Sequence, residues 1–423
     1  ELNMSNNIFE YVKVINQKSK NAFDNISRSS SKDRNLAILN TSLIIKKKQD
    51  EILQANKIDL ENAKQKKLTD AFVDRLILND KRINDIIYGL KKIAEMDDPI
   101  GIELSRWKQP NGLDISRISV PLGIIGIIYE SRPNVTIDAG SLCIKSGNTV
   151  ILRGGSDSIN SSKILARCLQ EGLMSANLPA EAVQMIDNTD REAVTAMLRS
   201  TGEIDVIIPR GGKSLVEKVQ QEAKVPVFAH LEGICHLYID KDADINKAIK
   251  VVINSKMRRT GICGALETLL IDKEICKKVV PTLVKKLIES GCHVKGDSET
   301  KAIADEIELA SEIDWETEYL EAILSIKIVK GVSGAINHIN KYSSNHTESI
   351  ITENKITAEN FLSSVDSAIV MHNASTQFAD GGEFGMGAEI GISTGRIHAR
   401  GPVGASQLTS FKYIVRGEDQ VRD

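Results

Sequence analysis

Short apolar runs separated by helical segments recur from about residue 122 onward, and this alternation constrains the fold more than any other feature. Segments with helical periodicity, such as 161–174 and 191–199, lie between most of the apolar runs. Strands that alternate with helices predict a parallel sheet with helices on both faces. The predicted strands of this first sheet are Gly123–Tyr129, Thr149–Leu152, Val183–Ile186, Asp205–Ile208 and Val225–Phe228.

A second α/β unit is expected to begin near Leu237. Asp242 stands in a position to cap a helix that ends near Met257. A short loop at 258–264 then leads to a predicted strand at 266–271, and helices and strands alternate to about residue 370. The side chains that this helix would bury are Ile245, Ile249, Val252 and Ile253.

The segments outside these two units do not show the alternation of strands and helices. Residues 5–100 show apolar residues at helical spacing, which predicts amphipathic helices that pack on another part of the chain. Residues 102–107 and 113–120 are strand-like and flank an Asn111-Gly112 pair, which is a strong hairpin signal because both residues tolerate positive φ. A last strand is expected at 408–415.

Composition excludes several classes of partner. The 423-residue chain is long enough for two to four domains, and its net charge of −3, without a long block of Lys and Arg, argues against nucleic acid and anionic membranes. The apolar run at 122–129 is too short to span a bilayer. The beginning of the chain shows no signal pattern, and the six cysteines form no CxxC pair, so we expect a cytoplasmic protein with reduced thiols. The histidines show no HxxxH spacing, so no metal site is predicted.

Cys263 is the strongest candidate among the cysteines for a catalytic nucleophile. It follows Arg258 and Arg259 in a loop of small residues, and nearby positive charge favours the reactive thiolate. The alternative is a buried structural thiol, which composition alone favours. Cys235 is the closer competitor because it follows Glu232-Gly233. The cysteines at 143, 168 and 276 lie in helical apolar patterns, and the one at 292 stays undecided.

Two glycine pairs follow predicted strands and open helices, where free N–H groups attract anions. An arginine beside each pair suits phosphate, and an additional arginine favours NADPH over NADH by analogy with other dinucleotide folds. The alternative is a tight turn that requires glycine, and no GxGxxG fingerprint is present. The two stretches are Arg153-Gly154-Gly155-Ser156 and Arg210-Gly211-Gly212.

A basic, glycine-flanked loop near the end of the chain contains His398 and Arg400. This loop is suited to an anionic substrate, and a solvated surface loop is the equal alternative. We therefore group both residues as candidate substrate-binding residues.

Several stretches together resemble the gamma-glutamyl phosphate reductase family, a branch of the aldehyde dehydrogenase superfamily. The similarity covers nearly the whole length from about residue 100 and, more loosely, the helical start. Each stretch alone is a weak signal, but the combination is highly specific. The stretches are Val120–Gly123, Tyr129–Asn134, Lys145–Gly155, His230–His236, Gly261–Thr268, Gly385–Gly391 and Thr409–Gly417.

The resemblance implies an aldehyde dehydrogenase-like α/β fold, with two α/β domains and a small β oligomerisation module. The expected bounds are 1–101 and 121–229 for the NADPH-binding domain, 230–384 for the catalytic domain, and 102–120 with 400–423 for the oligomerisation module. A homo-oligomer, either dimer or tetramer, follows from that module.

The resemblance also implies roles for individual residues. Cys263 falls on the catalytic cysteine, and Asn134 on the oxyanion-binding asparagine, with Arg132 beside it as a substrate-binding residue. Glu318 matches a glutamate that holds the nicotinamide ribose. Glu232 stands where a general base often lies, but a reductase must not hydrolyse its thioester, so we group Glu232 with the cofactor-binding residues. Arg153 replaces the usual adenosine-ribose lysine.

The implied reaction is the NADPH-dependent reduction of L-glutamate 5-phosphate to glutamate 5-semialdehyde through a Cys263 thioester, the second step of proline biosynthesis. A glutamate 5-kinase would precede it in the pathway and is a possible partner. Two other functions stay open: an aldehyde dehydrogenase that oxidises a free aldehyde, and a catalytically silent nucleotide-binding scaffold.

Overall fold

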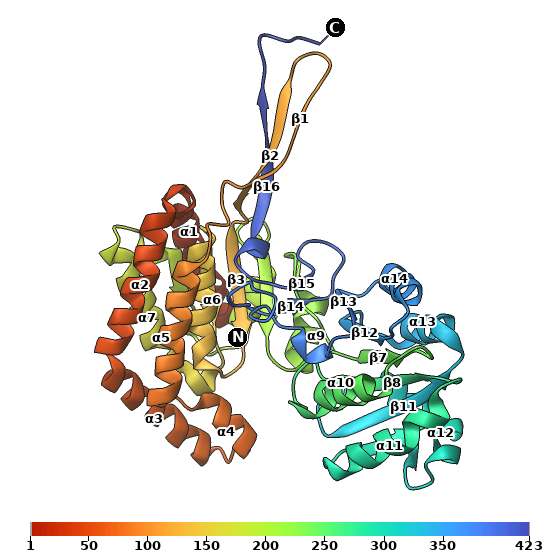
Figure 1. Cartoon of the computed structure of the whole chain (residues 1–423). Helices are drawn as coiled ribbons and strands as arrows, with labels where there is room; N and C mark the ends of the chain where they lie inside the picture. Colours follow the sequence, from red (N-terminus) through yellow and green to blue (C-terminus); the bar gives the residue numbers. More distant parts are fainter. Residues whose placement is uncertain (1, 423) are drawn as a thin grey trace. The chain divides into compact units, whose positions relative to one another are not determined.

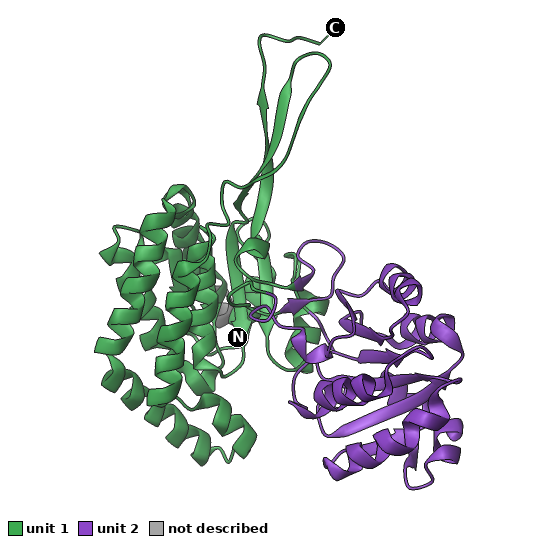
Figure 2. Cartoon of the chain, in the orientation of Figure 1, with its two compact units in different colours: residues 1–229, 385–391, 402–423 green, residues 230–384, 392–401 purple. Residues whose placement is uncertain are grey.

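The computed structural model describes residues 2–422, and in it two separate parallel sheets form the cores of two units (Figure 2). The first unit takes in the chain up to Ala229, residues 385–391 and the segment from Pro402 onward. The second unit takes in 230–384 and 392–401. The expected alternation of strands and helices is present in both units.

The first unit has a four-stranded parallel sheet in the order β5-β4-β3-β6. The fifth predicted strand, Val225–Phe228, is wrong as a strand: it makes one isolated bridge, between Ile207 and Val227. Pro226 lies at its centre and has no N–H to donate, which interrupts a ladder. The four strands are β3 (Ile124–Tyr129), β4 (Thr149–Arg153), β5 (Val183–Met185) and β6 (Val206–Arg210).

Helices cover both faces of this sheet. Apolar residues of α1, among them Ile8 and Val12, pack with the sheet and α8 on one face. On the other face α6 packs against α7, and α2, α3 and α5 pack outside them, as the amphipathic pattern of residues 5–100 predicted (Figure 1). The helices are α1 (Leu2–Arg28), α2 (Ser31–Lys47), α3 (Gln49–Gln65), α4 (Asp70–Leu76), α5 (Asp80–Glu95), α6 (Pro133–Lys145), α7 (Ile159–Ser175), α8 (Glu192–Leu198) and α9 (Lys213–Glu222).

A three-stranded antiparallel sheet extends from the first unit as a narrow arm (Figure 1). The predicted hairpin is confirmed as β1 (Glu103–Lys108) and β2 (Asp114–Pro121), and β16 (Thr409–Arg416) pairs with β2 along its whole length. Only Gly112 of the Asn-Gly pair has positive φ, and the N–H of Gly112 donates to the carbonyl of Gln109 at 2.9 Å. The N–H of Gln109 donates to the carbonyl of Leu113 at 2.8 Å and closes the loop between the two strands.

The second unit has a seven-stranded parallel sheet in the order β10-β9-β11-β8-β7-β12-β13. Its central strands β7 and β8 are buried along their whole length, as strands covered on both faces must be. The strands are β7 (Cys235–Ile239), β8 (Leu266–Asp272), β9 (His293–Gly296), β10 (Glu308–Leu309), β11 (Ile323–Val329), β12 (Thr347–Ile351) and β13 (Ile369–His372), and a short pair is formed by β14 (Ile392–Ser393) and β15 (Gly401–Pro402).

Helices α10, α11 and α12 cover one face of the second sheet, and α13 and α14 cover the other. The helix after β7 is capped by Asp244, whose side chain accepts from the N–H of Lys247 at 2.9 Å. The expected cap at Asp242 is therefore wrong by two residues. Asp242 instead accepts from the side chain of Asn354. The helices are α10 (Ile245–Met257), α11 (Cys276–Glu289), α12 (Ser298–Ile303), α13 (Gly331–Tyr342) and α14 (Lys355–Ser364).

Between residues 2 and 422, no helix is both long enough and apolar enough to span a membrane.

Candidate active site

Cys263 lies in the loop between α10 and β8, where the N–H of Ala265 donates to the carbonyl of Ile262 at 3.0 Å and closes a turn. The next residue, Gly264, packs so tightly that a Cβ there would lie 3.1 Å from the carbonyl oxygen of Thr376. Cys263 is partly exposed, whereas the other five cysteines are buried. The fold therefore leaves one thiol within reach of a ligand.

The remaining thiols are held in their protonated form. Burial raises the pKa of Cys168 to about 12 and that of Cys292 to about 11, and it raises the pKa of Cys143 and of Cys276 as well. Burial also raises the pKa of Cys235 well above its ordinary value, helped by the charge of Glu348. The thiol of Cys235 donates to the carbonyl oxygen of Cys263 at 3.1 Å. Cys235, the competitor in the sequence, thus supports the Cys263 loop.

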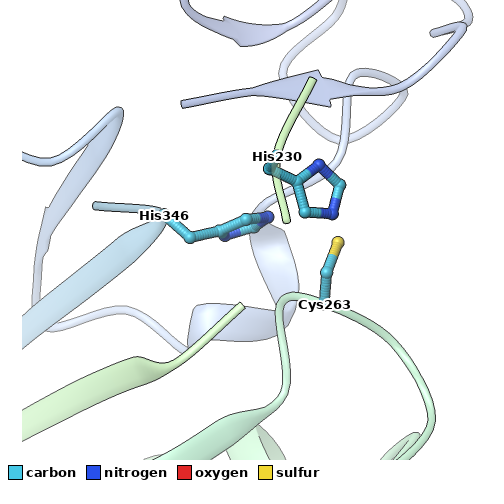
Figure 3. A group of neighbouring side chains, drawn as sticks. All are labelled: His230, Cys263 and His346. Atoms are coloured by element: carbon cyan, nitrogen blue, oxygen red, sulfur yellow. The ribbon is translucent and has the colours of Figure 1, made fainter. Parts of the chain in front are cut away.

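Two histidines lie beside Cys263, and the sequence analysis assigned a role to neither (Figure 3). One nitrogen of His230, one of His346 and the sulfur of Cys263 all lie within 4.8 Å of one another. Nδ1 of His230 is 2.6 Å from the carbonyl oxygen of Ile392, so it carries the hydrogen and donates it. Nε2 of His230 is then the nitrogen that faces the sulfur (Figure 3).

His346 precedes β12 and is fully buried. Its Nδ1 lies 2.8 Å from Oγ1 of Thr347, and its ring meets that of His230 edge to face at 5.1 Å. Burial, with a smaller effect of His230, lowers the pKa of His346 to about 3, so its imidazole is neutral at physiological pH. The two histidines are 116 positions apart in the sequence, so no local spacing signals them.

Glu318 and Gly233 hold a second loop against Cys263. Oε1 of Glu318 accepts from the N–H of Gly233 at 2.9 Å. A Cβ on Gly233 would lie 2.1 Å from the carbonyl oxygen of Cys263, so the two backbones touch. Glu232 and Glu318, both predicted to bind cofactor, are thereby brought to the Cys263 loop.

A buried ion pair supports the same region. Nζ of Lys256 lies 2.7 Å from Oε2 of Glu267, and neither side chain is exposed. Burial raises the pKa of Glu267 to about 7, and Lys256 opposes that shift. Oε1 of Glu267 also accepts from the N–H of Leu320 at 3.3 Å, which ties the start of β8 to the segment that contains Glu318.

A separate cavity of about 460 Å³ opens in the first unit at the carboxyl ends of β3 and β4. In open parallel sheets, ligands bind at this edge, where neighbouring crossovers diverge. Among the predicted residues, Arg153, Gly155 and Ser156 line it, whereas Gly154, Arg210, Gly211 and Gly212 do not. The residues that the sequence analysis missed here include Glu130, Ser131, Arg191, Ser214 and Lys218.

Arg153 is largely committed to the protein. Its guanidinium donates to the carbonyls of Gly154 at 2.8 Å and Thr189 at 3.0 Å, and burial lowers its pKa. Arg191, which is exposed, and Lys218, which is half-buried, line the same cavity. These two side chains are better placed than Arg153 to meet an anionic group.

The glycine pairs serve close packing, because none of the four glycines has positive φ. A Cβ on Gly155 would lie 2.6 Å from Oγ of Ser131, and one on Gly211 would lie 2.7 Å from the side chain of Glu130. The N–H of Gly212 donates to Oε2 of Glu130 at 3.0 Å, so a carboxylate of the protein already stands at the start of α9.

The other predicted residues lie at the start of α6 and in the loop before β15. Nδ2 of Asn134 donates to Oδ2 of Asp138 at 3.1 Å in the first turns of α6, and Arg132 is the N-cap of that helix. His398 is exposed, and Arg400 pairs with Asp366 at 2.7 Å in the second unit. Their roles toward substrate stay predictions.

Comparison with known proteins decides the family. The model of the "Aldehyde dehydrogenase family" matches residues 10–303. A gamma-glutamyl phosphate reductase of Brucella suis biovar 1 is 54% identical over 420 residues, which cover 99% of this chain and 100% of that protein. The chain belongs to the aldehyde dehydrogenase family, among the gamma-glutamyl phosphate reductases. The family resemblance seen in the sequence is thus confirmed.

Two more members of this family agree. A gamma-glutamyl phosphate reductase of Parvibaculum lavamentivorans is 54% identical over 398 residues, covering 94% of each chain. The crystal structure of the gamma-glutamyl phosphate reductase of Thermotoga maritima is 45% identical and matches with a TM-score of 0.95 over 97% of this chain and 100% of that one. The predicted α/β aldehyde dehydrogenase-like fold is confirmed by this match.

Proposed function

We propose that this chain reduces L-glutamate 5-phosphate to L-glutamate 5-semialdehyde and phosphate with NADPH, through a thioester on Cys263. This is the second step of proline biosynthesis. One observation carries the proposal: in a chain 54% identical to a gamma-glutamyl phosphate reductase, the single partly exposed cysteine lies beside two imidazoles. A thiol beside a base is the arrangement that nucleophilic catalysis on an acyl group requires.

The first half of the reaction forms the thioester. Nε2 of His230 takes the proton of the Cys263 thiol, because Nδ1 already donates to Ile392 and leaves Nε2 as the acceptor. The sulfur attacks the acyl carbon, the S–C bond forms, and the C–O bond to phosphate breaks. His346 packs against His230 and stays neutral, so His230 is the imidazole that holds the proton in this proposal.

The second half releases the aldehyde. NADPH, when bound, would supply the hydride that reduces the thioester carbon. The resulting oxyanion is stabilised by the backbone N–H of Cys263 and the side-chain amide of Asn134 in this proposal. Its collapse breaks the S–C bond, frees the semialdehyde, and lets the thiolate regain its proton from His230.

The cavity of the first unit supports the cofactor assignment. It lies at the carboxyl edge of a parallel sheet and contains Arg191 and Lys218, which fit the additional phosphate of NADPH. Arg153, Gly155, Ser156 and, in the second unit, Glu232 and Glu318 are the other proposed cofactor contacts. For the substrate, we propose Arg132, His398 and Arg400, whose positive groups suit its phosphate and carboxylate.

The domain roles follow from these assignments. We propose the first unit for NADPH, the second for catalysis, and the β1-β2-β16 arm for homo-oligomerisation, as a dimer or tetramer. The glutamate 5-kinase that makes this unstable acyl phosphate is a proposed partner. None of the six cysteines, all of them within residues 2–422, is in a disulfide, which fits a reducing compartment such as the cytoplasm.

The test is the reverse reaction, followed as NADP⁺ reduction with the semialdehyde. We expect the reaction to require inorganic phosphate; oxidation without phosphate would instead support the free-aldehyde dehydrogenase. Cys263→Ala is expected to abolish turnover while NADPH still binds, and Cys276→Ala, at a buried thiol on α11, serves as the matched control. Turnover retained in Cys263→Ala would falsify the thioester.

A further inference from the structure

The group of Cys263, His230 and His346 has the composition of a zinc site. One thiolate and two imidazoles are ligands that Zn²⁺ prefers. Their donor atoms all lie within 4.8 Å of one another. A tetrahedral zinc ion, with bonds of about 2.0 Å to nitrogen and 2.3 Å to sulfur, sets its ligands about 3.4 Å apart, so the donors need to approach by about 1.4 Å at most. Side-chain rotations supply movements of that size.

Both imidazoles are oriented for ligation by their second nitrogen. Metal-binding histidines typically donate the other ring N–H to a carbonyl or another oxygen, which fixes the ring. Nδ1 of His230 donates to the carbonyl of Ile392, and Nδ1 of His346 lies 2.8 Å from Oγ1 of Thr347. Nε2 of each ring therefore points toward the sulfur (Figure 3).

His346 provides an independent sign of a ligand. Its side chain is fully buried, yet Nε2 has no hydrogen-bond partner within residues 2–422. A buried polar atom without a partner is costly unless something meets it. A proton donor from substrate or a bound cation would satisfy this nitrogen, and the neighbouring thiol selects a thiophilic cation.

We propose that Cys263 Sγ, His230 Nε2 and His346 Nε2 bind a thiophilic divalent cation, Zn²⁺ above all, and that the bound ion blocks the nucleophile. Binding replaces the thiol proton: the S–H bond breaks, the proton passes to solvent, the S–Zn bond forms, and no redox step occurs. Three protein ligands leave a fourth position for water. The ion thus switches the enzyme off reversibly, and this inhibition rests on the proposed function, whereas the binding does not.

The binding test needs no activity. Chelator-treated protein is titrated with Co²⁺, and a thiolate-to-cobalt charge-transfer absorption with one equivalent bound is expected; Zn²⁺ then displaces the cobalt. Cys263→Ser is expected to remove the absorption, and His346→Gln to weaken binding at least tenfold. His293→Gln is the matched control, because His293 is an exposed imidazole paired with Glu308 next to Cys292. Equal affinity in His346→Gln and the unmodified chain would overturn the site.

If His346→Gln does not fold, Thr347→Val removes the support of Nδ1 and is expected to weaken the cobalt complex about tenfold. The inhibition is tested separately in the phosphate-dependent assay, where Zn²⁺ should stop turnover and a chelator should restore it. Full turnover with one equivalent of Zn²⁺ bound would overturn the inhibition and leave the site standing. A cobalt complex in a chain without reductase activity would contradict only the proposed function.

Discussion

Glu318 accepts a hydrogen bond from the N–H of Gly233 at 2.9 Å, and Gly233 in turn lies against the backbone of Cys263. The glutamate therefore positions the loop that backs the nucleophile. Because the backbones of Gly233 and Cys263 are in direct contact, a single methyl group on Gly233 is enough to displace the Cys263 loop.

Gly233→Ala is expected to reduce kcat by about 100-fold or more, because its Cβ would stand 2.1 Å from the carbonyl oxygen of Cys263 and displace the sulfur. Gly261→Ala is the control: it lies in the same loop as Cys263, but the nearest atom to its added Cβ is 3.8 Å away. Steady-state kinetics with both variants checks the prediction. Equal losses would indicate a general sensitivity of this loop.

Arg191→Ala is expected to weaken NADPH binding about tenfold and NADH binding little, because an exposed guanidinium in the cavity meets the additional phosphate. Arg153→Ala is expected to lower the free energy of unfolding instead, since Arg153 holds the carbonyls of Gly154 and Thr189. Fluorescence titrations with both cofactors and urea unfolding separate the two effects. NADPH selectivity lost in a fully stable Arg153→Ala would reverse the assignment.

Glu267→Gln is expected to lower the free energy of unfolding by about 3 kcal/mol, because it leaves the buried ammonium of Lys256 without its carboxylate. The double change Lys256→Met with Glu267→Leu should recover most of that loss. The exposed pair of Lys247 and Glu353 provides the control, where the same changes are expected to cost little because solvent screens the two charges. Urea unfolding measures all three, and a double change as unstable as the single one would contradict the prediction.

Asp138→Asn is expected to stabilise the protein increasingly as pH rises from about 4 to 6, and fully above about pH 6. Burial raises the pKa of Asp138 to about 6, against the hydrogen bond from Asn134 and the charge of Arg210. The folded state thus binds the proton more tightly than the unfolded state, so the free energy of unfolding falls as pH rises from about 4 to 6 and stays lower above it. The amide removes that loss, on the order of 3 kcal/mol near pH 8. A difference between the two proteins that does not change with pH would contradict this.

The sequence predicted the sheets well because buried parallel strands such as Ile124–Tyr129 are continuous apolar runs. The sequence-based prediction failed where a single backbone hydrogen bond determines whether a strand forms or where a helix begins. Pro226 removes a ladder donor and with it a strand, and Asp244, two residues after the expected cap, accepts from the N–H of Lys247 in the first turn of α10. Neither outcome is visible in the periodicity of the side chains.

The site was predictable only in part. Cys263 stood out by its small neighbours. His230, in the segment before β7, and His346, directly before β12, are far apart in the sequence, and the pairing of β7 with β12 brings them together. Arg153 was misleading in the opposite way. A charged residue beside glycines suggests phosphate, yet the side chain is buried and two of its guanidinium nitrogens donate to the carbonyls of Gly154 and Thr189.

The β1-β2-β16 arm carries exposed aromatic residues that a single chain leaves in water. Trp107 and Tyr413 meet edge to face at 6.2 Å, Tyr413 meets Phe411 at 5.7 Å, and the guanidinium of Arg117 lies 4.0 Å over Phe411. An exposed apolar patch of this kind typically marks a protein–protein interface. A second copy of the chain is the proposed occupant.

Trp107→Glu combined with Tyr413→Glu is therefore expected to break the oligomer, because each buried carboxylate would lose its hydration without gaining a partner. Light scattering should then report the mass of one chain, 46.4 kDa, while circular dichroism stays unchanged. Met174→Glu, at a similarly exposed apolar residue on α7, is the control and should leave the mass as it was. If the double variant keeps the mass of the unmodified protein, the subunits meet elsewhere, and the arm has another role.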